Sequence, residues 1–428
     1  MLAVRAFGRP YIFFDLRIYH GAVVWWWGGN DLYEFIAPDI TLGFTYPPFA
    51  AIMMAPMVVV DVTTAGYLSA FASLTALAAV LIAILVPVAD RCGWPRWFAV
   101  AVALPMAWAT EPVRETLGYG QVNLLLFGLI MADLVALRWR YRAGVRTPRS
   151  TGFQLRRLWT DGAWAGVGIG LATAIKLTPA LFICYLLITR QWRAAATALG
   201  TAVGVTVGGF LIASRESFTY FTSVLWQTDR VGVADMTPNQ SLAGLLARLY
   251  DSRETPGLLW LAFAMLLLAV GLSRAVSAHG EGDELAAFTL VGLTANVVSP
   301  ISWSHHLVFV LPAIVILLDA GLRRRAASRG LIGFSALAGV RQIAAAVGVF
   351  ALFVISPIWP YEHQLPHVSH YADGLFGALA ENSLALALIA LVAALPWRPG
   401  AEPAFYTEPA LHVGRRVLDP AGPRVTGS

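Results

Sequence analysis

Residues 64–89 read TAGYLSAFASLTALAAVLIAILVPVA and contain no charged side chain. An α-helix needs about 20 predominantly apolar residues to cross the roughly 30 Å hydrocarbon core of a bilayer, so this stretch predicts a membrane span. Further apolar stretches predict spans at 97–111, 118–137, 163–175, 179–189, 194–213, 256–274, 285–298, 304–320, 331–356 and 373–395. The pattern therefore predicts an all-α, polytopic membrane protein with about 11 membrane helices.

The composition of the chain supports this fold class. Of its 428 residues 58% are hydrophobic and only 13% are charged, and the mean hydropathy is +0.66. Soluble domains carry about 25% charged residues. The net charge of +5 is explained by basic loops beside an anionic inner leaflet, so membrane lipids and no nucleic acid are the expected partners. Cys92 and Cys184 lie in or beside apolar stretches, as small buried side chains do, and give no disulfide or metal spacing.

Three segments depart from a simple span. Residues 47–60 are apolar but short and predict a re-entrant or interfacial helix, and the tryptophan-rich segment 18–29 predicts a helix at the headgroup level. Residues 163–189 are interrupted by a Lys-Leu-Thr-Pro sequence. We interpret them as two short half-spans that meet at the outer surface, with Thr178 capping the second and Pro179 beginning it.

Threading the chain through these spans separates two kinds of residue. The arginine clusters at 138–157, 190–193 and 323–329 fall on one side, and the polar groups described below fall on the other. Because cytoplasmic loops carry the excess of positive charge, the polar face is predicted to be extracytoplasmic in a multi-pass plasma-membrane protein. No apolar span precedes Asp15, so the sequence is expected to lack a first membrane helix.

The chain is predicted to divide into two parts. Residues 1–398 are expected to form one multispanning catalytic domain. Residues 399–428 are rich in proline, glycine and arginine and have no apolar periodicity, which predicts a disordered cytoplasmic tail.

Asp15 is the first candidate for chemistry. It lies among Phe13, Phe14 and Tyr19, and partial desolvation there would raise the carboxyl pKa above its usual value of about 3.9. Such a carboxylate suits a general base that takes a proton from a sugar hydroxyl. The alternative is an interfacial charge that is paired with Arg17 or solvated.

Lys176 is the only lysine in the chain, and it ends a hydrophobic segment. Ionisable residues at membrane depth are expensive and commonly functional. Near the outer surface its ammonium is placed to hold a lipid-linked phosphate, helped by the free N–H groups of the helix that follows. The alternative is a lysine that snorkels to the interface.

His305 and His306 follow a predicted break at 299–304. Adjacent residues on a helix point about 100° apart, so the pair is not expected to bind one metal. We interpret both as donors to phosphate oxygens or sugar hydroxyls; the alternative is a helix cap with a polar interfacial pair. His363 and His367 would suit a metal only in a helix, and the proline between them argues against one, so no metal site is expected.

Amide and phenol side chains on the same face form the last group of candidates. An amide offers both a donor and an acceptor, which suits neutral sugar hydroxyls, although such residues are also common helix caps. The predicted sugar- and acceptor-binding residues are Tyr19, Tyr46, Gln121, Asn123, Asn239 and Gln240.

These residues occur in an ordered series of short strings that resembles one known family. The strings are Asp15-Leu16-Arg17-Ile18-Tyr19, Phe44-Thr45-Tyr46-Pro47-Pro48-Phe49-Ala50, Gly120-Gln121-Val122-Asn123, Lys176-Leu177-Thr178-Pro179, Asn239-Gln240-Ser241-Leu242 and Ser299-Pro300-Ile301-Ser302-Trp303-Ser304-His305-His306. Each string alone is unspecific, but the ordered set resembles glycosyltransferase family 87, the polyprenol-phosphate-mannose-dependent mannosyltransferases of actinobacteria.

The resemblance implies the GT-C fold and an α-(1→2)-mannosyltransferase that acts on phosphatidylinositol mannosides or lipomannan of the cell envelope. It implies a polyprenyl-phosphate-mannose donor, a glycolipid mannoside acceptor, and a catalytic base in the first outer loop, which maps onto Asp15. The donor phosphate is expected near Lys176, His305 and His306. The implied reaction is a single inverting displacement that requires no cofactor.

Two other functions remain open from the sequence. One is a transferase that uses a different polyprenyl-phosphate sugar, such as arabinofuranose. The other is a lipid or solute transporter without chemistry; transporters often carry internal repeats and place polar residues at the midplane, whereas here no repeat is evident and the polar residues gather at one face.

Overall fold

The computed structural model describes residues 12–38, 42–146, 160–250, 254–329, 337–364 and 374–402. Within these ranges the chain is helical, and the pairs Ile36–Gly43 and Asn239–Trp303 form isolated bridges rather than strands. The predicted all-α class is therefore confirmed. The loop around His367 and the tail from residue 403 lie outside the described residues.

The helices follow one another along the chain with short connections. The α-helices are α2 (Phe14–Trp27), α3 (Pro48–Met54), α4 (Val62–Cys92), α5 (Arg96–Ala109), α6 (Glu111–Tyr119), α7 (Asn123–Arg146), α9 (Val167–Ile175), α10 (Ala180–Ile188), α11 (Trp192–Ile212), α12 (Ser214–Thr222), α13 (Leu242–Leu249), α14 (Gly257–Gly280), α15 (Glu284–Val298), α16 (Val310–Arg329), α17 (Val340–Ile355), α18 (Ile358–Gln364), α19 (Gly374–Glu381) and α20 (Ser383–Ala394). The 3-10 turns are η1 (Leu32–Glu34), η2 (Ala55–Val59), η3 (Val224–Trp226), η4 (Thr228–Val231) and η5 (Ser304–His306).

Each predicted span contains at least one of these helices. Four stretches are long and apolar enough to cross a membrane by themselves: Val62–Cys92, Trp192–Ile212, Gly257–Gly280 and Val340–Tyr361. The pair α19 and α20, bent by 66°, would make a fifth broken span. Many of their large apolar side chains are exposed, as expected for helices that face lipid.

Two local predictions about helix ends were wrong. The break at Lys176 is real and separates α9 from α10, but Thr178 does not cap α10; Pro179 is the N-cap residue and no side chain caps the helix. The predicted span at 304–320 begins later, because Ser304–His306 form the turn η5 and α16 starts only at Val310. Both breaks place chemically capable residues in non-helical backbone.

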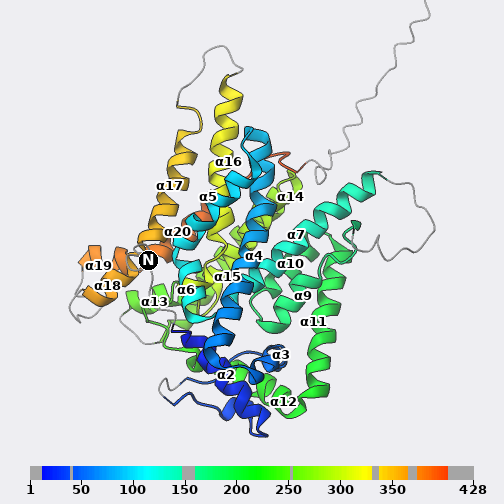
Figure 1. Ribbon diagram of the computed structural model, residues 1–428. Helices are drawn as coiled ribbons and strands as arrows, with labels where there is room; N and C mark the ends of the chain where they lie inside the picture. The colour runs from blue at the N-terminus through cyan, green and yellow to red at the C-terminus, as the bar shows by residue number, and fades with distance from the viewer. Residues whose placement is uncertain are drawn as a thin grey trace, which may run out of the picture.

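The bundle has two distinct ends. Helices α2, α3 and α12 gather at one end, whereas α4, α16 and α17 extend to the other (Figure 1). The start of α2 is anchored near the N-terminal part of α4, because Gly66 packs directly on the ring of Phe13 and leaves no room for a side chain. The N–H of Phe13 also donates to the carbonyl of Gly118 at 2.9 Å, which ties α2 to α6.

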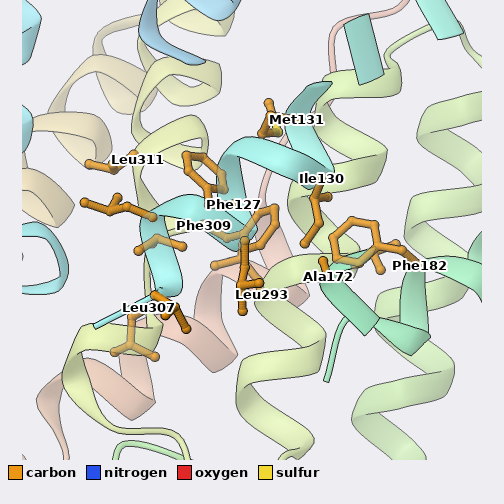
Figure 2. Packing of buried hydrophobic residues seen from close by; sticks show 14 of the residues in the cluster. Phe127, Ile130, Met131, Ala172, Phe182, Leu293, Leu307, Phe309 and Leu311 are labelled. Carbon is orange, nitrogen blue, oxygen red and sulfur yellow. The ribbon is translucent and has the colours of Figure 1, made fainter. Parts of the chain in front are cut away.

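The apolar core lies between α7, α9, α10, α15 and α16 (Figure 2). The rings of Phe127 and Phe309 meet edge to face with centroids 5.0 Å apart, and the ring of Phe182 lies 5.5 Å from that of Phe309. These three rings also line a small cavity beneath Lys176 and His306. The core thus forms the floor under the polar residues at the breaks.

Helix α9, which ends just before Lys176, is held closely against its neighbours. A carboxylate oxygen of Asp133 on α7 accepts a hydrogen bond from the N–H of Ile169 at 2.6 Å. Gly170 faces α11 so closely that an added Cβ would lie 2.5 Å from the carbonyl oxygen of Ala198. Close packing of this kind fixes the height at which Lys176 leaves the helix.

Candidate active site

A cavity of about 270 Å³ opens beside α2 at the end of the bundle where α3 and α12 lie. Segments that are far apart in the sequence meet around it: α2, the loop before α3, the break between α9 and α10, the region 220–231 and the loop before η5. Of the predicted site residues, the cavity is lined by Asp15, Tyr19, Tyr46, Gln121, Lys176 and His306.

Asp15 occupies the first turn of α2 and reaches the cavity wall. The preceding residue but one, Phe13, adopts a left-handed conformation with φ 49°, and the bulk of its ring fixes where the helix begins. Burial raises the pKa of the Asp15 carboxyl from 3.8 to about 6, against the hydrogen bond from Gln121 and the charge of Lys176, which both lower it. Its Oδ2 is buried without a hydrogen-bond partner among the described residues. This carboxylate is therefore poised to accept a proton.

A chain of polar side chains continues from Gln121. The hydroxyl of Tyr19 donates to that of Tyr46 at 3.2 Å, and the hydroxyl of Tyr46 donates to Oε1 of Gln121 at 3.2 Å. Because Oε1 of Gln121 accepts this bond, its amide nitrogen is the group left to donate to Asp15. The backbone carbonyl of Tyr46 accepts from the Tyr33 hydroxyl at 2.8 Å, which holds the loop before α3 in place.

Lys176 faces the same cavity from the break between α9 and α10. Its Nζ donates to Oδ1 of Asn123 at 3.3 Å, lies 3.0 Å from Nε2 of His306, and lies 5.6 Å from the centroid of the Tyr46 ring. Burial lowers the pKa of Lys176 to about 8, and the charge of Asp15 partly opposes the shift. At pH 7 the ammonium is thus roughly 90% protonated. The arrangement puts one cation close to one carboxylate within a single cavity.

The two histidines have different surroundings. His306 lines the cavity; burial, then the charge of Lys176, keeps the His306 pKa well below 6.5. Because the Lys176 ammonium donates to Nε2, the neutral ring carries its proton on Nδ1. His305 does not line the cavity: its ring packs against Tyr119 and His306, with centroid distances of 5.6 Å and 4.6 Å. The backbone carbonyl of His305 instead accepts from Asn123.

Three predicted amide residues lie away from the main cavity. Asn123 lines the smaller cavity and bridges Lys176 to the His305 carbonyl, with an Nδ2–O distance of 3.2 Å. Asn239 is fully buried; its Oδ1 accepts from the N–H groups of Ser241 and Ser302. Gln240 is also fully buried and bonds only to backbone groups among the described residues. Their surroundings are those of residues that hold loops, not of residues that face a ligand.

Sequence reasoning missed Arg230, which lines the cavity from η4. Its guanidinium donates to the carbonyl of Tyr33 at 2.7 Å and to Oε1 of Gln227 at 3.4 Å. No carboxylate within ion-pair distance is found for it in the part of the chain that the structure describes. An arginine on the face predicted to be poor in arginine was the available signal. Tyr220 and Trp303, which also line the cavity, gave no comparable signal.

Comparisons with known proteins agree on one family. The sequence profile of glycosyltransferase family 87 matches residues 44–300. A polyprenol-phosphate-mannose-dependent α-(1-2)-phosphatidylinositol mannoside mannosyltransferase of Mycobacterium tuberculosis is 34% identical over 355 residues, 79% of this chain and 77% of that protein. A polyprenol-phosphate-mannose-dependent α-(1-2)-phosphatidylinositol pentamannoside mannosyltransferase of Mycolicibacterium smegmatis is 30% identical over 76% of this chain and 74% of that protein.

Among solved structures, the crystal structure of ArnT from Cupriavidus metallidurans bound to undecaprenyl phosphate has a TM-score of 0.37 and 15% sequence identity. The similarity covers 91% of this chain and 73% of that chain.

Proposed function

Because this chain belongs to glycosyltransferase family 87, we propose that it transfers mannose from polyprenyl-phosphate mannose to the 2-hydroxyl of a lipid-anchored mannoside. The relatives support this donor, since their names specify polyprenol-phosphate-mannose dependence and an α-(1-2) linkage. They also support a phosphatidylinositol mannoside as the acceptor. The observation that carries the mechanism is the shared cavity of Asp15 and Lys176.

Asp15 acts as the general base. The family profile begins at residue 44, so its role rests on geometry and charge rather than on that match. The acceptor 2-hydroxyl gives its proton to the carboxylate while its oxygen forms the new bond to the anomeric carbon. The bond from that carbon to the phosphate oxygen breaks on the opposite face, so a β-linked donor yields an α-linked product. Gln121 orients the carboxylate through its hydrogen bond.

Lys176 stabilises the phosphate that leaves. Negative charge grows on the bridging oxygen in the transition state, and a fixed cation in a partly buried site stabilises that charge more than water does. The leaving group is a polyprenyl phosphate anion, so no general acid is needed. His306 orients the Lys176 ammonium through its Nε2 and offers its Nδ1–H as a further donor.

The remaining residues of the cavity wall hold the sugars. Tyr19 and Tyr46 present phenol rings and hydroxyls, which suit the apolar faces and the hydroxyls of pyranose rings. Arg230 supplies a second cation and keeps guanidinium donors beyond its two bonds to protein oxygens. The wall thus offers contacts for two sugars and two sites of positive charge.

The reaction takes place at the extracytoplasmic face. The C-terminal ends of α7 and α16 carry clustered arginines, and they lie at the end of the bundle away from α2. Such arginine clusters face the cytoplasm in most membrane proteins. The cavity beside α2 therefore opens on the outer side of the plasma membrane.

The purified protein in liposomes, supplied with labelled polyprenyl-phosphate mannose and a phosphatidylinositol mannoside, tests this function. Transfer of label into an α-(1→2)-linked product that depends on Asp15 is expected. Labelled polyprenyl-phosphate arabinose serves in a parallel reaction. Transfer from arabinose alone would assign a different donor, and movement of label across the bilayer without transfer would identify a transporter.

A further inference from the structure

A second polar cavity, of about 120 Å³, lies at the other end of the bundle. It is lined by Ile84, Pro87 and Val88 of α4, Arg138 and Arg142 of α7, Leu285 of α15, Asp319 and Arg323 of α16, and by Arg398, Ala401 and Glu402 of the final described segment. Eighteen residues of α4 separate Gly66, which packs on Phe13, from Ile84. At 1.5 Å per residue this is about 27 Å, close to the thickness of the hydrocarbon core.

Several arginines around this cavity are held by carboxylates. Arg398 bonds Asp283 and reaches Asp319 at 3.0 Å, while Arg138 forms a two-pronged pair with Glu402 at 2.7 Å and 2.8 Å. These pairs fasten residues 398–402 across the ends of α7, α15 and α16. The predicted tail therefore begins, at 399–402, as packed chain.

The positive charge exceeds the negative charge. The cavity wall contains four arginines and two carboxylates. Adding the groups immediately behind it, Arg91 beside Asp319 and Asp283 beside Arg398, raises each side by one and keeps the excess at two. A buried or half-buried excess of this size favours a bound anion.

Two of the wall arginines have unused hydrogen-bond donors. Arg142 has no hydrogen-bond or ion-pair partner among the described residues, and it lies one helical turn beyond Arg138 on the same face of α7. Arg323 uses its Nε for Asp319 at 2.9 Å, which leaves its terminal nitrogens unbound within the described residues. Their guanidinium forks match the geometry of a tetrahedral oxyanion.

We propose that this cavity binds a phosphate group at the cytoplasmic end of the bundle, contributed by an anionic membrane lipid or by free phosphate. The apolar residues of α4 and Leu285 form the other part of the wall and lie beside helices that span the membrane, as a lipid-bound phosphate requires. Basic pockets between helices on this side of a membrane are suited to anionic headgroups. The bound phosphate would brace α7, α16 and residues 398–402 from a site separate from the catalytic cavity.

Native mass spectrometry of the full-length protein tests the site, using phosphatidylglycerol and phosphatidylcholine as competing probes. We expect preferential retention of phosphatidylglycerol. Arg142→Gln should weaken it about fivefold, and Arg142→Gln combined with Arg323→Gln about thirtyfold, as expected for one and two basic residues near an anionic headgroup. Asp319 keeps Arg91 and Arg398 as partners in the double variant, so its local charge stays balanced.

Arg325→Gln is the matched control, because this exposed arginine lies on the same helix outside the cavity wall. Inorganic phosphate at constant ionic strength forms the second arm. If it raises the thermal midpoint of the wild type, but not that of Arg142→Gln, the ligand is free phosphate; a response to phosphatidylglycerol alone identifies the lipid. Equal retention of the two lipids with no response to phosphate, an unchanged Arg142→Gln protein, or an equal loss in Arg325→Gln would overturn the proposal.

Discussion

Replacing Asp15 by Asn removes the proposed base and almost nothing else. The two side chains have nearly the same shape, and an amide can still bond to Gln121. General-base catalysis contributes about 10²–10⁴-fold to a rate, so turnover is expected to fall by this factor, about 2.7–5.4 kcal/mol in activation free energy.

The same change should stabilise the fold. The Asp15 carboxyl has a folded-state pKa of about 6, above its ordinary value of 3.8, so the folded protein holds this proton more tightly than the unfolded chain does. Stability from this group is present below about pH 4 and is lost as the pH rises through about 6. At pH 7 the ionised carboxyl costs up to about 3 kcal/mol, which Asn avoids. A residue that served only the structure would show the opposite effect.

The assay follows mannose transfer in liposomes between pH 4.5 and 9, with thermal unfolding measured on the same preparations. The wild-type kcat/KM should rise with pH through about 6, as Asp15 ionises, and fall above about 8, as Lys176 loses its proton. Asp61→Asn is the control, because Asp61 is an exposed carboxylate that caps α4, and Asn caps helices equally well.

Two results would refute this reasoning. One is an Asp15→Asn protein that keeps more than a tenth of the wild-type turnover. The other is a wild-type profile with no acidic limb near pH 6, because a carboxylate that accepts the proton must be ionised before transfer.

Four further perturbations test other parts of the site. Lys176→Gln should raise the KM for the donor about tenfold or more without changing that for the acceptor, and should move the acidic limb above pH 6 because the Lys176 charge lowers the pKa of the base; an unmoved limb would contradict the shared cavity. Asn239→Ala should lower stability by about 2–4 kcal/mol while leaving both KM values unchanged, since its bonds hold backbone groups; a selective rise in a KM would instead restore it as a ligand residue. Gly66→Ala should cost about 1–3 kcal/mol and reduce transfer by displacing the ring that anchors α2, whereas Gly200→Ala, which meets nothing within 4 Å, should do neither. Arg230→Gln should weaken binding of a phosphate-bearing substrate by about 10-fold to 100-fold, and unchanged KM values for donor and acceptor would exclude this role.

The positions of the helices were predictable from the sequence. A span of apolar residues such as 64–89 must form a helix in hydrocarbon, because every backbone polar group has to be satisfied within the segment. The breaks at Lys176 and before His305 were visible for the converse reason: proline and clustered polar residues do not fit the interior of a span. The exact helix ends were not predictable, since the capping of α10 and the start of α16 depend on neighbouring segments.

The site was only partly predictable. Asp15, Lys176 and Gln121 were identified because charged or amide groups near apolar spans are costly and therefore conspicuous. His305 and Asn239 looked equally promising in the sequence, yet one ring packs on Tyr119 and the other side chain holds the backbone of Ser302. Arg230 was missed because its loop has no periodicity from which a direction follows.

The sequence by itself determined an all-helical membrane protein with two interrupted regions and its chemically capable residues on one face. Hydrocarbon imposes those features locally, one segment at a time. Only the tertiary structure decided that Asp15, Lys176, His306 and Arg230 share one cavity while their neighbours hold loops. The direction of a side chain at a helix break is fixed by the segments that pack around it, and no short-range pattern records which segments those are.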